Sequence, residues 1–119
     1  METIFNLNKG KNMKLRELKT IDIQAKQWKD KINGNSYFSS EITLNYGQPN
    51  EERYEYPFAY GYGDQYEHSS LELVKNLFPK SKWFKSKYTY QKWRLKDEYR
   101  ISVNSSIKKD CFQRELIHA

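Results

Sequence analysis

Apolar and polar residues alternate along the N-terminal half of the chain, and this pattern predicts strands. Ile21, Ile23 and Ala25 are separated by single polar residues, a period of two that is typical of a strand with one buried face. We expect strands over about 18–28 and 37–46. The second strand would place one set of alternate side chains on a single face: Phe38, Ser40, Ile42, Leu44 and Tyr46.

A third strand is expected over about 52–60, with turns on either side of the second strand. Asn33-Gly34 is a strong hairpin signal because both residue types tolerate a positive φ, and Gly47-Gln48-Pro49-Asn50 has the composition of a turn. Pro57 has no backbone donor, so the third strand is predicted to lie at a sheet edge or to stop pairing there. The three strands would form an antiparallel meander. The third would carry four aromatic residues on one face: Tyr54, Tyr56, Phe58 and Tyr60.

The clearest helix is predicted over about 69–78. Ser69 is a suitable N-cap, Glu72 three residues later completes a capping box, and Pro79 would end the helix. The apolar side chains repeat at helical spacing along one face: Leu71, Val74, Leu77 and Phe78. We expect this face to pack on the meander.

The segment from Lys80 to Glu98 carries mixed signals. Its aromatic first part favours strand, whereas 91–98 contains good helix formers. Alternation resumes farther on, so one or two further strands are expected near 99–104 and 107–113. The predicted fold class is therefore α+β, with a three-stranded N-terminal meander packed on one helix and the C-terminal strands completing the sheet.

A chain of 119 residues has room for one domain, which we assign to residues 13–119. Residues 1–12 are expected to be a flexible leader, with Met13 as an alternative start. No run approaches the ~20 apolar residues of a membrane span, and the N-terminus has no signal-peptide core. The single cysteine, Cys111, excludes an intrachain disulfide. These features predict a cytoplasmic protein that is not associated with a membrane.

Charge is distributed unevenly along the chain, whose net charge is +6. Residues 41–72 contain seven acidic residues against one basic residue, and residues 80–100 contain eight basic residues against two acidic ones. Such a separation affects the choice of partner and the rate of association, not the fold. The basic segment favours a polyanionic partner and the acidic segment favours a basic one.

Aromatic residues interleave with the cations of the basic segment. Lys and Arg neutralise phosphates, and flat aromatic rings stack on unpaired bases, so this segment is a candidate site for single-stranded RNA or DNA. Two alternatives remain open: the aromatic residues fill the core, or the segment binds an acidic protein surface. The candidate residues are Lys80, Lys82, Trp83, Lys85, Lys87, Tyr88, Tyr90, Lys92, Trp93, Arg94, Lys96 and Arg100.

A second candidate surface is acidic and rich in tyrosine. Carboxylates and phenol rings can imitate phosphates and bases, so this surface would suit docking onto a basic protein that handles nucleic acid. Alternatively, the acidic residues only solubilise the surface, and Gly61-Tyr62-Gly63 is a tight strand-to-helix turn. The candidate residues are Glu51, Glu52, Glu55, Tyr60, Tyr62, Asp64, Tyr66 and Glu67.

Signals for catalysis are sparse. His68 and His118 are the only histidines, and a general acid–base pair acting on RNA would need both. Asp64, Glu67 and His68 offer metal-ligand chemistry without a recognised spacing. Cys111 is best interpreted as a small buried side chain. We therefore predict no metal, no cofactor and no enzymatic activity, with a small nuclease as a distant alternative.

Two segments, Trp28 to Phe38 and Pro57 to Gly63, resemble small uncharacterised proteins of bacteriophages and mobile elements, with a likeness that covers about residues 18–68. The resemblance implies an accessory protein, a class that includes inhibitors of host defence such as anti-CRISPR proteins. It assigns no role to any single residue. The leading hypothesis is then a non-enzymatic accessory protein that binds and modulates or inhibits a nucleic-acid-handling complex, such as a CRISPR effector. Direct binding of single-stranded RNA or DNA is the alternative.

Overall fold

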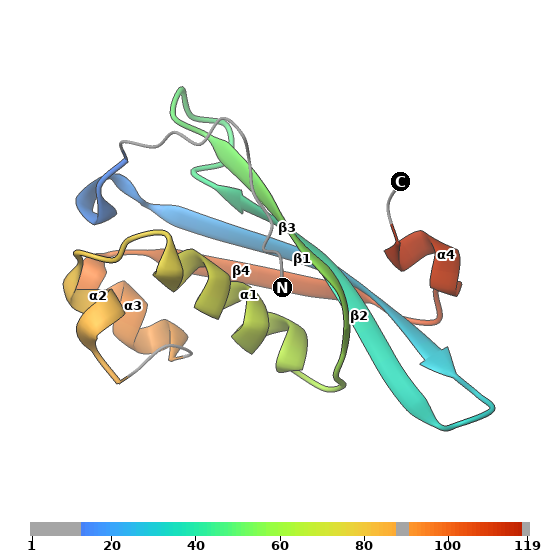
Figure 1. Cartoon of the computed structure of the whole chain (residues 1–119). Helices are drawn as coiled ribbons and strands as arrows, with labels where there is room; N and C mark the ends of the chain where they lie inside the picture. The colour runs from blue at the N-terminus through green and yellow to red at the C-terminus, as the bar shows by residue number, and fades with distance from the viewer. Residues whose placement is uncertain (1–12, 88–90, 118–119) are drawn as a thin grey trace.

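The computed structural model describes residues 13–87 and 91–117, which form an α+β fold. Figure 1 shows one twisted sheet with helices packed against it. The strands are β1 (Thr20–Asp30), β2 (Asn35–Leu44), β3 (Glu52–Tyr60) and β4 (Ser102–Lys108), in the order β3-β2-β1-β4. A 3-10 helix, η1 (Leu15–Glu17), precedes β1. The α-helices are α1 (Gln65–Asn76), α2 (Lys82–Lys85), α3 (Lys92–Tyr99) and α4 (Gln113–Leu116).

The predicted meander of β1, β2 and β3 is confirmed, since both neighbouring pairs are antiparallel. The first hairpin closes through a four-residue loop between Asp30 and Asn35. A carboxylate oxygen of Asp30 accepts hydrogen bonds from the backbone N–H groups of Ile32 and Asn33, at 3.0 and 3.3 Å. Gly34 has a φ of +78° and donates its N–H to the Asp30 carbonyl. The Asp30 side chain therefore shapes the loop, and only its last residue needs a positive φ.

The four aromatic residues of β3 do not share one face, so that prediction was wrong. The register between β2 and β3 shifts at Pro57 and Phe58, which together oppose a single residue of β2. This β-bulge suits a proline, because the bulged residue need not donate a ladder hydrogen bond. The extra residue reverses the alternation. Tyr54 and Tyr56 pack toward the helices, whereas Phe58 and Tyr60 point to the opposite face of the sheet.

Helix α1 is present, but it begins at Gln65 rather than at Ser69, and its N-cap position is Asp64. Gly63 has a φ of +64° immediately before that cap, so the chain has already turned when the helix begins. Ser69 lies within the first turns, where its hydroxyl accepts a hydrogen bond from the Gln65 amide at 2.9 Å. The predicted capping box at Ser69 is therefore wrong, because the turn at Gly63 lets the helix begin four residues earlier.

Between residues 91 and 117 the structure has one strand, which agrees with the one or two strands expected, but its bounds differ from those predicted. The aromatic first part of the 80–98 segment is not a strand where the structure describes it, since Trp83 and Phe84 lie in α2. Residues 88–90, which include Tyr88 and Tyr90, are outside the described residues. Tyr99 ends α3, so the strand expected from residue 99 begins at Ser102. Beyond Lys108 the chain leaves the sheet, and the strand predicted up to residue 113 gives way to α4.

Strand β4 lies beside β1 and runs parallel to it, from the pair Thr20–Ser102 to the pair Lys26–Lys108. The connection from β3 through α1, α2 and α3 crosses one face of the sheet (Figure 1). Helix α4 lies against the other face, where Glu115 approaches Lys108. The main core fills the space between the sheet and the first three helices. Its buried residues are Leu18, Ile21, Ile23, Ile42, Leu44, Tyr54, Leu71, Val74, Phe78, Trp83, Leu95 and Ile101.

Candidate functional site

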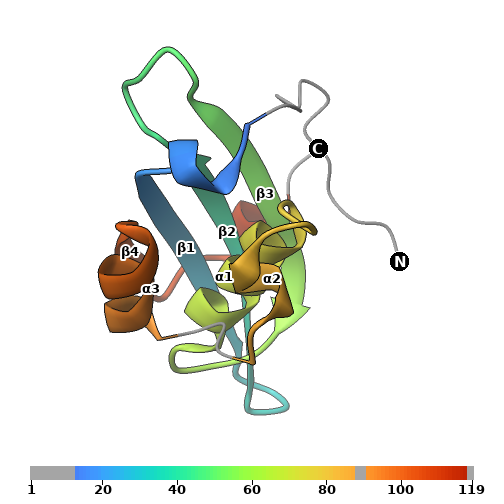
Figure 2. The same ribbon diagram turned by 90° about the vertical axis from the view of Figure 1, so that its left-hand side faces the viewer.

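The basic–aromatic segment lies at one end of the molecule, where α2 and α3 are found. Figure 2 looks onto this end. Most of its cationic side chains are exposed, and only Arg94 is half-buried. Six of the exposed cations form no ion pair with a described residue. We call these six the basic end: Lys80, Lys82, Lys85, Lys87, Lys96 and Arg100.

The aromatic residues of the segment divide between core and surface. Trp83 is completely buried, so it belongs to the core, as one of the alternatives held. Phe84 is 38% exposed and Trp93 is 58% exposed. Tyr88 and Tyr90 are outside the described residues. Two aromatic rings are therefore accessible among the cations of the described segment.

The capping of α2 explains why neighbouring aromatic residues point in opposite directions. The Ser81 hydroxyl accepts a hydrogen bond from the Phe84 N–H at 3.1 Å and donates one to the Phe78 carbonyl at 2.7 Å. This N-cap fixes the start of the helix. The fixed turn directs Trp83 into the core and leaves Phe84 in contact with solvent.

On α3, Trp93 has a cation next to its ring. The guanidinium carbon of Arg94 lies 4.8 Å from the centre of the Trp93 ring, a cation–π distance. Arg94 also forms an ion pair with Glu98 one turn later, at 2.7 Å. Arg94 thus flanks the exposed ring and places a positive charge beside it.

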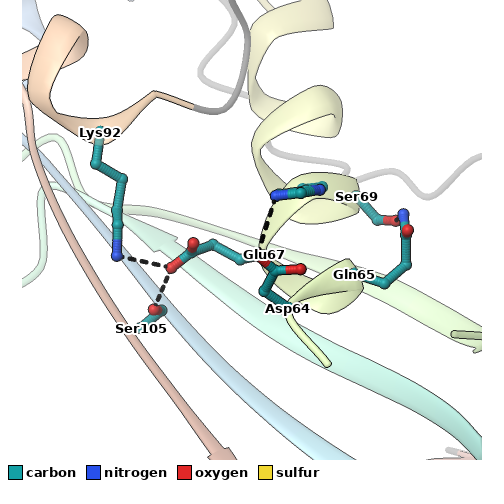
Figure 3. A network of polar contacts seen from close by, with 7 residues as sticks. Asp64, Gln65, Glu67, Ser69, Lys92 and Ser105 are labelled. Atoms are coloured by element: carbon teal, nitrogen blue, oxygen red, sulfur yellow. Dashed lines mark hydrogen bonds and ion pairs between the residues drawn. The ribbon is translucent and has the colours of Figure 1, made fainter. Parts of the chain in front are cut away.

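Lys92, another predicted contact residue, is exposed but is paired within the protein. Its Nζ lies 3.0 Å from Oε2 of Glu67, and the Ser105 hydroxyl donates a hydrogen bond to the same oxygen. Figure 3 shows these three side chains converging from α3, α1 and β4. Glu67 is buried. The arrangement anchors the start of α3, so Lys92 positions the helix and Glu67 is withdrawn from the predicted acidic surface.

The predicted acidic and tyrosine-rich set does not form one surface. Glu51 and Glu52 lie at the start of β3, Tyr60 is its last residue, and Tyr62 and Asp64 follow it. A nine-residue strand separates the two groups, which corresponds to roughly 30 Å. The remaining members are half-buried: Glu55 and Tyr66.

Several of these acidic groups have partners within the protein. Glu51 accepts a hydrogen bond from the Gly47 N–H and forms an ion pair with Arg53, both at 2.8 Å. These contacts, led by the Gly47 bond, lower the pKa of Glu51. The Tyr54 hydroxyl donates to Glu52 at 2.6 Å, and burial, assisted by Glu52, raises the pKa of Tyr54. The acidic residues near the start of β3 therefore serve the local turn and strand.

His68 lies on α1 with its Nε2 atom 3.4 Å from Oδ2 of Asp64, one helical turn away. The other histidine, His118, is outside the described residues. Cys111 is buried, as expected for a small apolar side chain, and its thiol donates to the Lys108 carbonyl at 3.4 Å.

Sequence reasoning missed an aromatic cluster on the sheet face opposite α1. The Tyr37 and Phe58 rings are stacked with their centres 5.0 Å apart, and the ring centres of Trp28 and Tyr37 are 5.4 Å apart. Tyr60 meets Tyr37 edge to face at 5.8 Å. Alternation alone placed Phe58 and Tyr60 on the same face as Tyr54 and Tyr56, and only the bulge at Pro57 separates them. The signal was Pro57 itself, which predicted a sheet edge or an end of pairing. Strand β3 does lie at the sheet edge, but its pairing with β2 resumes at Ala59 after the bulge.

Comparison with protein-family models, curated proteins and solved structures found no match to this chain. None of the helices in the described residues is long and apolar enough to cross a bilayer. Within 13–87 and 91–117, no three His, Cys, Asp or Glu side chains come together as metal ligands would. The basic end, in contrast, offers exposed cations together with two exposed aromatic rings.

Proposed function

We propose that this protein is a non-enzymatic binding protein that holds single-stranded RNA or DNA at its basic end. The observation that supports this proposal is the exposure of Trp93 and Phe84 among outward-pointing cations. Phosphates of a single strand would contact the lysines, with release of counterions. Unpaired bases would stack on the two rings, each worth about 1–3 kcal/mol.

The arrangement of charges favours nucleic acid over an acidic protein at this site. A flexible strand can follow cations that are spread over two helices, because every nucleotide carries a phosphate and a base with a flat face. The six cations of the basic end are distributed over both helices and the residues next to them. Lys80 precedes α2, Lys82 and Lys85 lie in α2, Lys87 follows α2, Lys96 lies in α3 and Arg100 follows α3. An exposed indole beside Arg94 offers stacking together with charge.

A second candidate function is docking onto a nucleic-acid-handling protein complex, as an anti-CRISPR protein would do. Exposed apolar side chains favour this function, since three of them lie at or just beyond the C-terminal ends of β1 and β3. Ile32 is 92% exposed, Tyr60 59% and Tyr62 69%. Aromatic residues of this kind are enriched in protein interfaces. This function predicts a tight complex with one protein and weak binding to free nucleic acid.

Fluorescence anisotropy of labelled single-stranded RNA and DNA, at two salt concentrations, tests the first proposal. We expect micromolar or tighter binding that weakens steeply with salt. Trp93→Ala should weaken binding about 5-fold or more, because one stacking position is lost. The matched control is Phe112→Ala at the start of α4. It removes a ring that is 61% exposed and that also has an arginine beside it, with the guanidinium carbon of Arg114 4.6 Å from the ring centre.

The control variant should bind as the unmodified protein does. Absence of binding at low salt would overturn the proposal and leave the protein-docking function. Equal losses in the Trp93→Ala and Phe112→Ala variants would also contradict it, because the effect would then not be specific to the basic end.

A further inference from the structure

The structure contains a groove that the sequence did not indicate, between η1 and the connection from α1 to α2. We propose that this groove holds the sugar–phosphate backbone of the bound single strand where it leaves the basic end. The inference rests on the proposed function and extends it to a second set of residues. It makes the binding site longer than the segment from 80 to 100.

Cations stand on both sides of the groove. Lys14 is the N-cap residue of η1, Arg16 lies within η1, and Lys80 of the basic end lies in the chain that follows α1. All three side chains are exposed, and none forms an ion pair with a described residue. The nearby Glu17 carboxylate accepts the backbone N–H of Lys14 at 2.9 Å. Three unpaired cations around one groove form a concave positive surface, which concentrates anions.

Apolar atoms line the groove between these cations. Met13, Leu77 and Phe78 contribute to its wall, and Leu77 is 37% exposed although it is a large apolar residue. A groove that combines positive charge with apolar surface suits a ligand that has both phosphates and flat, weakly polar rings. A nucleotide backbone with its sugars and bases has this composition. A simple inorganic anion would leave the apolar wall without a partner.

The groove is continuous with the basic end. Ser81 lines the groove and is also the N-cap residue of α2, which carries Lys82, Phe84 and Lys85. In Figure 2, η1, α2 and α3 all belong to the end of the molecule that faces the viewer. A strand stacked on Phe84 would therefore reach the groove without crossing the sheet.

The test compares two double variants with equal loss of charge. One is Lys14→Ser with Arg16→Ser, which leaves Lys80 and the rest of the basic end unchanged. The control is Lys29→Ser with Lys31→Ser, two exposed lysines away from the groove. Binding of oligothymidylates of increasing length is measured at several salt concentrations. For the unmodified protein, affinity should rise with length until the strand spans both the basic end and the groove.

The groove variant should show a smaller slope of log K against log salt, by about 1.4, since each of the two lost phosphate contacts contributes about 0.7. Its affinity should also stop rising at a shorter oligonucleotide, whereas the control should retain the length dependence. An unchanged slope and length dependence in the groove variant would overturn this inference and leave the proposed function intact. Absence of binding by the unmodified protein would overturn both. Stronger displacement by polyglutamate than by oligothymidylate would assign the groove to an acidic protein instead.

Discussion

Glu67 of α1 and Lys92 of α3 form an ion pair, with Nζ and Oε2 3.0 Å apart, although they are 25 residues apart in sequence. The carboxylate is nearly enclosed, with 12% of its side chain exposed, and the lysine is 46% exposed. The Ser105 hydroxyl provides a further donor from β4. This contact holds the first turn of α3, from which Trp93 points outward. The geometry of the proposed surface therefore depends on a charge pair below it.

Glu67→Gln should destabilise the protein because Lys92 would lose its charged partner. Breaking a fully buried ion pair costs about 3–5 kcal/mol, and the partial exposure of Lys92 reduces this loss to about 1–3 kcal/mol. Urea unfolding measures the change. Glu72→Gln on the same helix is the matched control and should stay within about 0.5 kcal/mol of the unmodified protein. A Glu67→Gln variant as stable as this control would contradict the structural role of the pair.

Ser40 and Ser70 share a hydrogen bond of 2.7 Å in the buried layer between β2 and α1. Replacing either serine with alanine would leave one buried hydroxyl unpaired, at a cost of about 1–3 kcal/mol. Replacing both removes the unpaired group, so the double variant should lose less stability than the sum of the two single losses. A double-mutant cycle in urea measures this coupling. Simple additivity would show that the two hydroxyls do not depend on each other.

Asn45 connects η1 to the sheet and lines no proposed binding surface. Its Oδ1 accepts hydrogen bonds from the N–H groups of Lys19 and Thr20, at 2.7 and 3.3 Å, and its Nδ2 donates to the Glu17 carbonyl at 2.9 Å. Its φ is +53°. Asn45→Ala should cost about 3 kcal/mol or more, because it loses these bonds and strains the backbone.

Asn45→Gly separates the two causes, since glycine adopts a positive φ without strain. It should be more stable than Asn45→Ala by about 1–2 kcal/mol but still less stable than the unmodified protein. Thermal or urea unfolding of the two variants measures this order. Equal stability of the glycine variant and the unmodified protein would mean that the side-chain hydrogen bonds contribute nothing.

Local patterns in the sequence predicted the strands well. They failed for features that depend on contacts between residues far apart in the sequence. The alternation at Ile21 and Ile23 depends only on neighbours, so the strands of the meander were predictable. The faces of Phe58 and Tyr60 depend on a bulge, which is defined by the pairing with β2. The start of α1 was misplaced because Ser69 has good capping chemistry at a position that the fold does not use for a cap.

The candidate site shows the same limit. The cations of 80–100 were evident because they are neighbours in sequence. The groove was not, because Lys14 and Lys80 approach only after β1 and α1 have folded. Nor could the sequence distinguish Trp83 from Phe84, which are adjacent and of similar character. The cap at Ser81 determines which of the two is buried.

Acid should destabilise the protein, because three carboxyl groups have lowered pKa values. Hydrogen bonds from Asn33 lower the pKa of Asp30 below 3.8, and backbone bonds from Gly47 and Phe112 lower those of Glu51 and Glu115 below 4.5. A carboxyl group whose pKa is lower in the folded state than in the unfolded state stabilises the folded protein at a pH above its unfolded-state pKa. This stabilisation is lost as the pH falls through its folded-state pKa.

The midpoint temperature of thermal unfolding should therefore be steady from pH 7 to about 5. It should decrease once the pH is lower than the ordinary carboxyl pKa values. Glu51→Gln should reduce this fall, because one of the three groups no longer titrates. Gln48→Ala, which replaces an exposed side chain of the neighbouring turn that does not titrate, is the control and should leave the fall unchanged. A midpoint that rises toward pH 3 would contradict the direction derived from these contacts.

Fluorescence distinguishes the two tryptophans of the basic–aromatic segment. Trp93 is 58% exposed and Trp83 is completely buried, so iodide should quench Trp93 strongly and Trp83 little. Trp93→Phe should remove most of the emission that iodide quenches, whereas Trp83→Phe should retain it. If a single strand stacks on Trp93, saturating oligothymidylate should protect this same fraction from iodide. Persistent quenching in the Trp93→Phe variant would place the accessible indole elsewhere, with half-buried Trp28 as the remaining source.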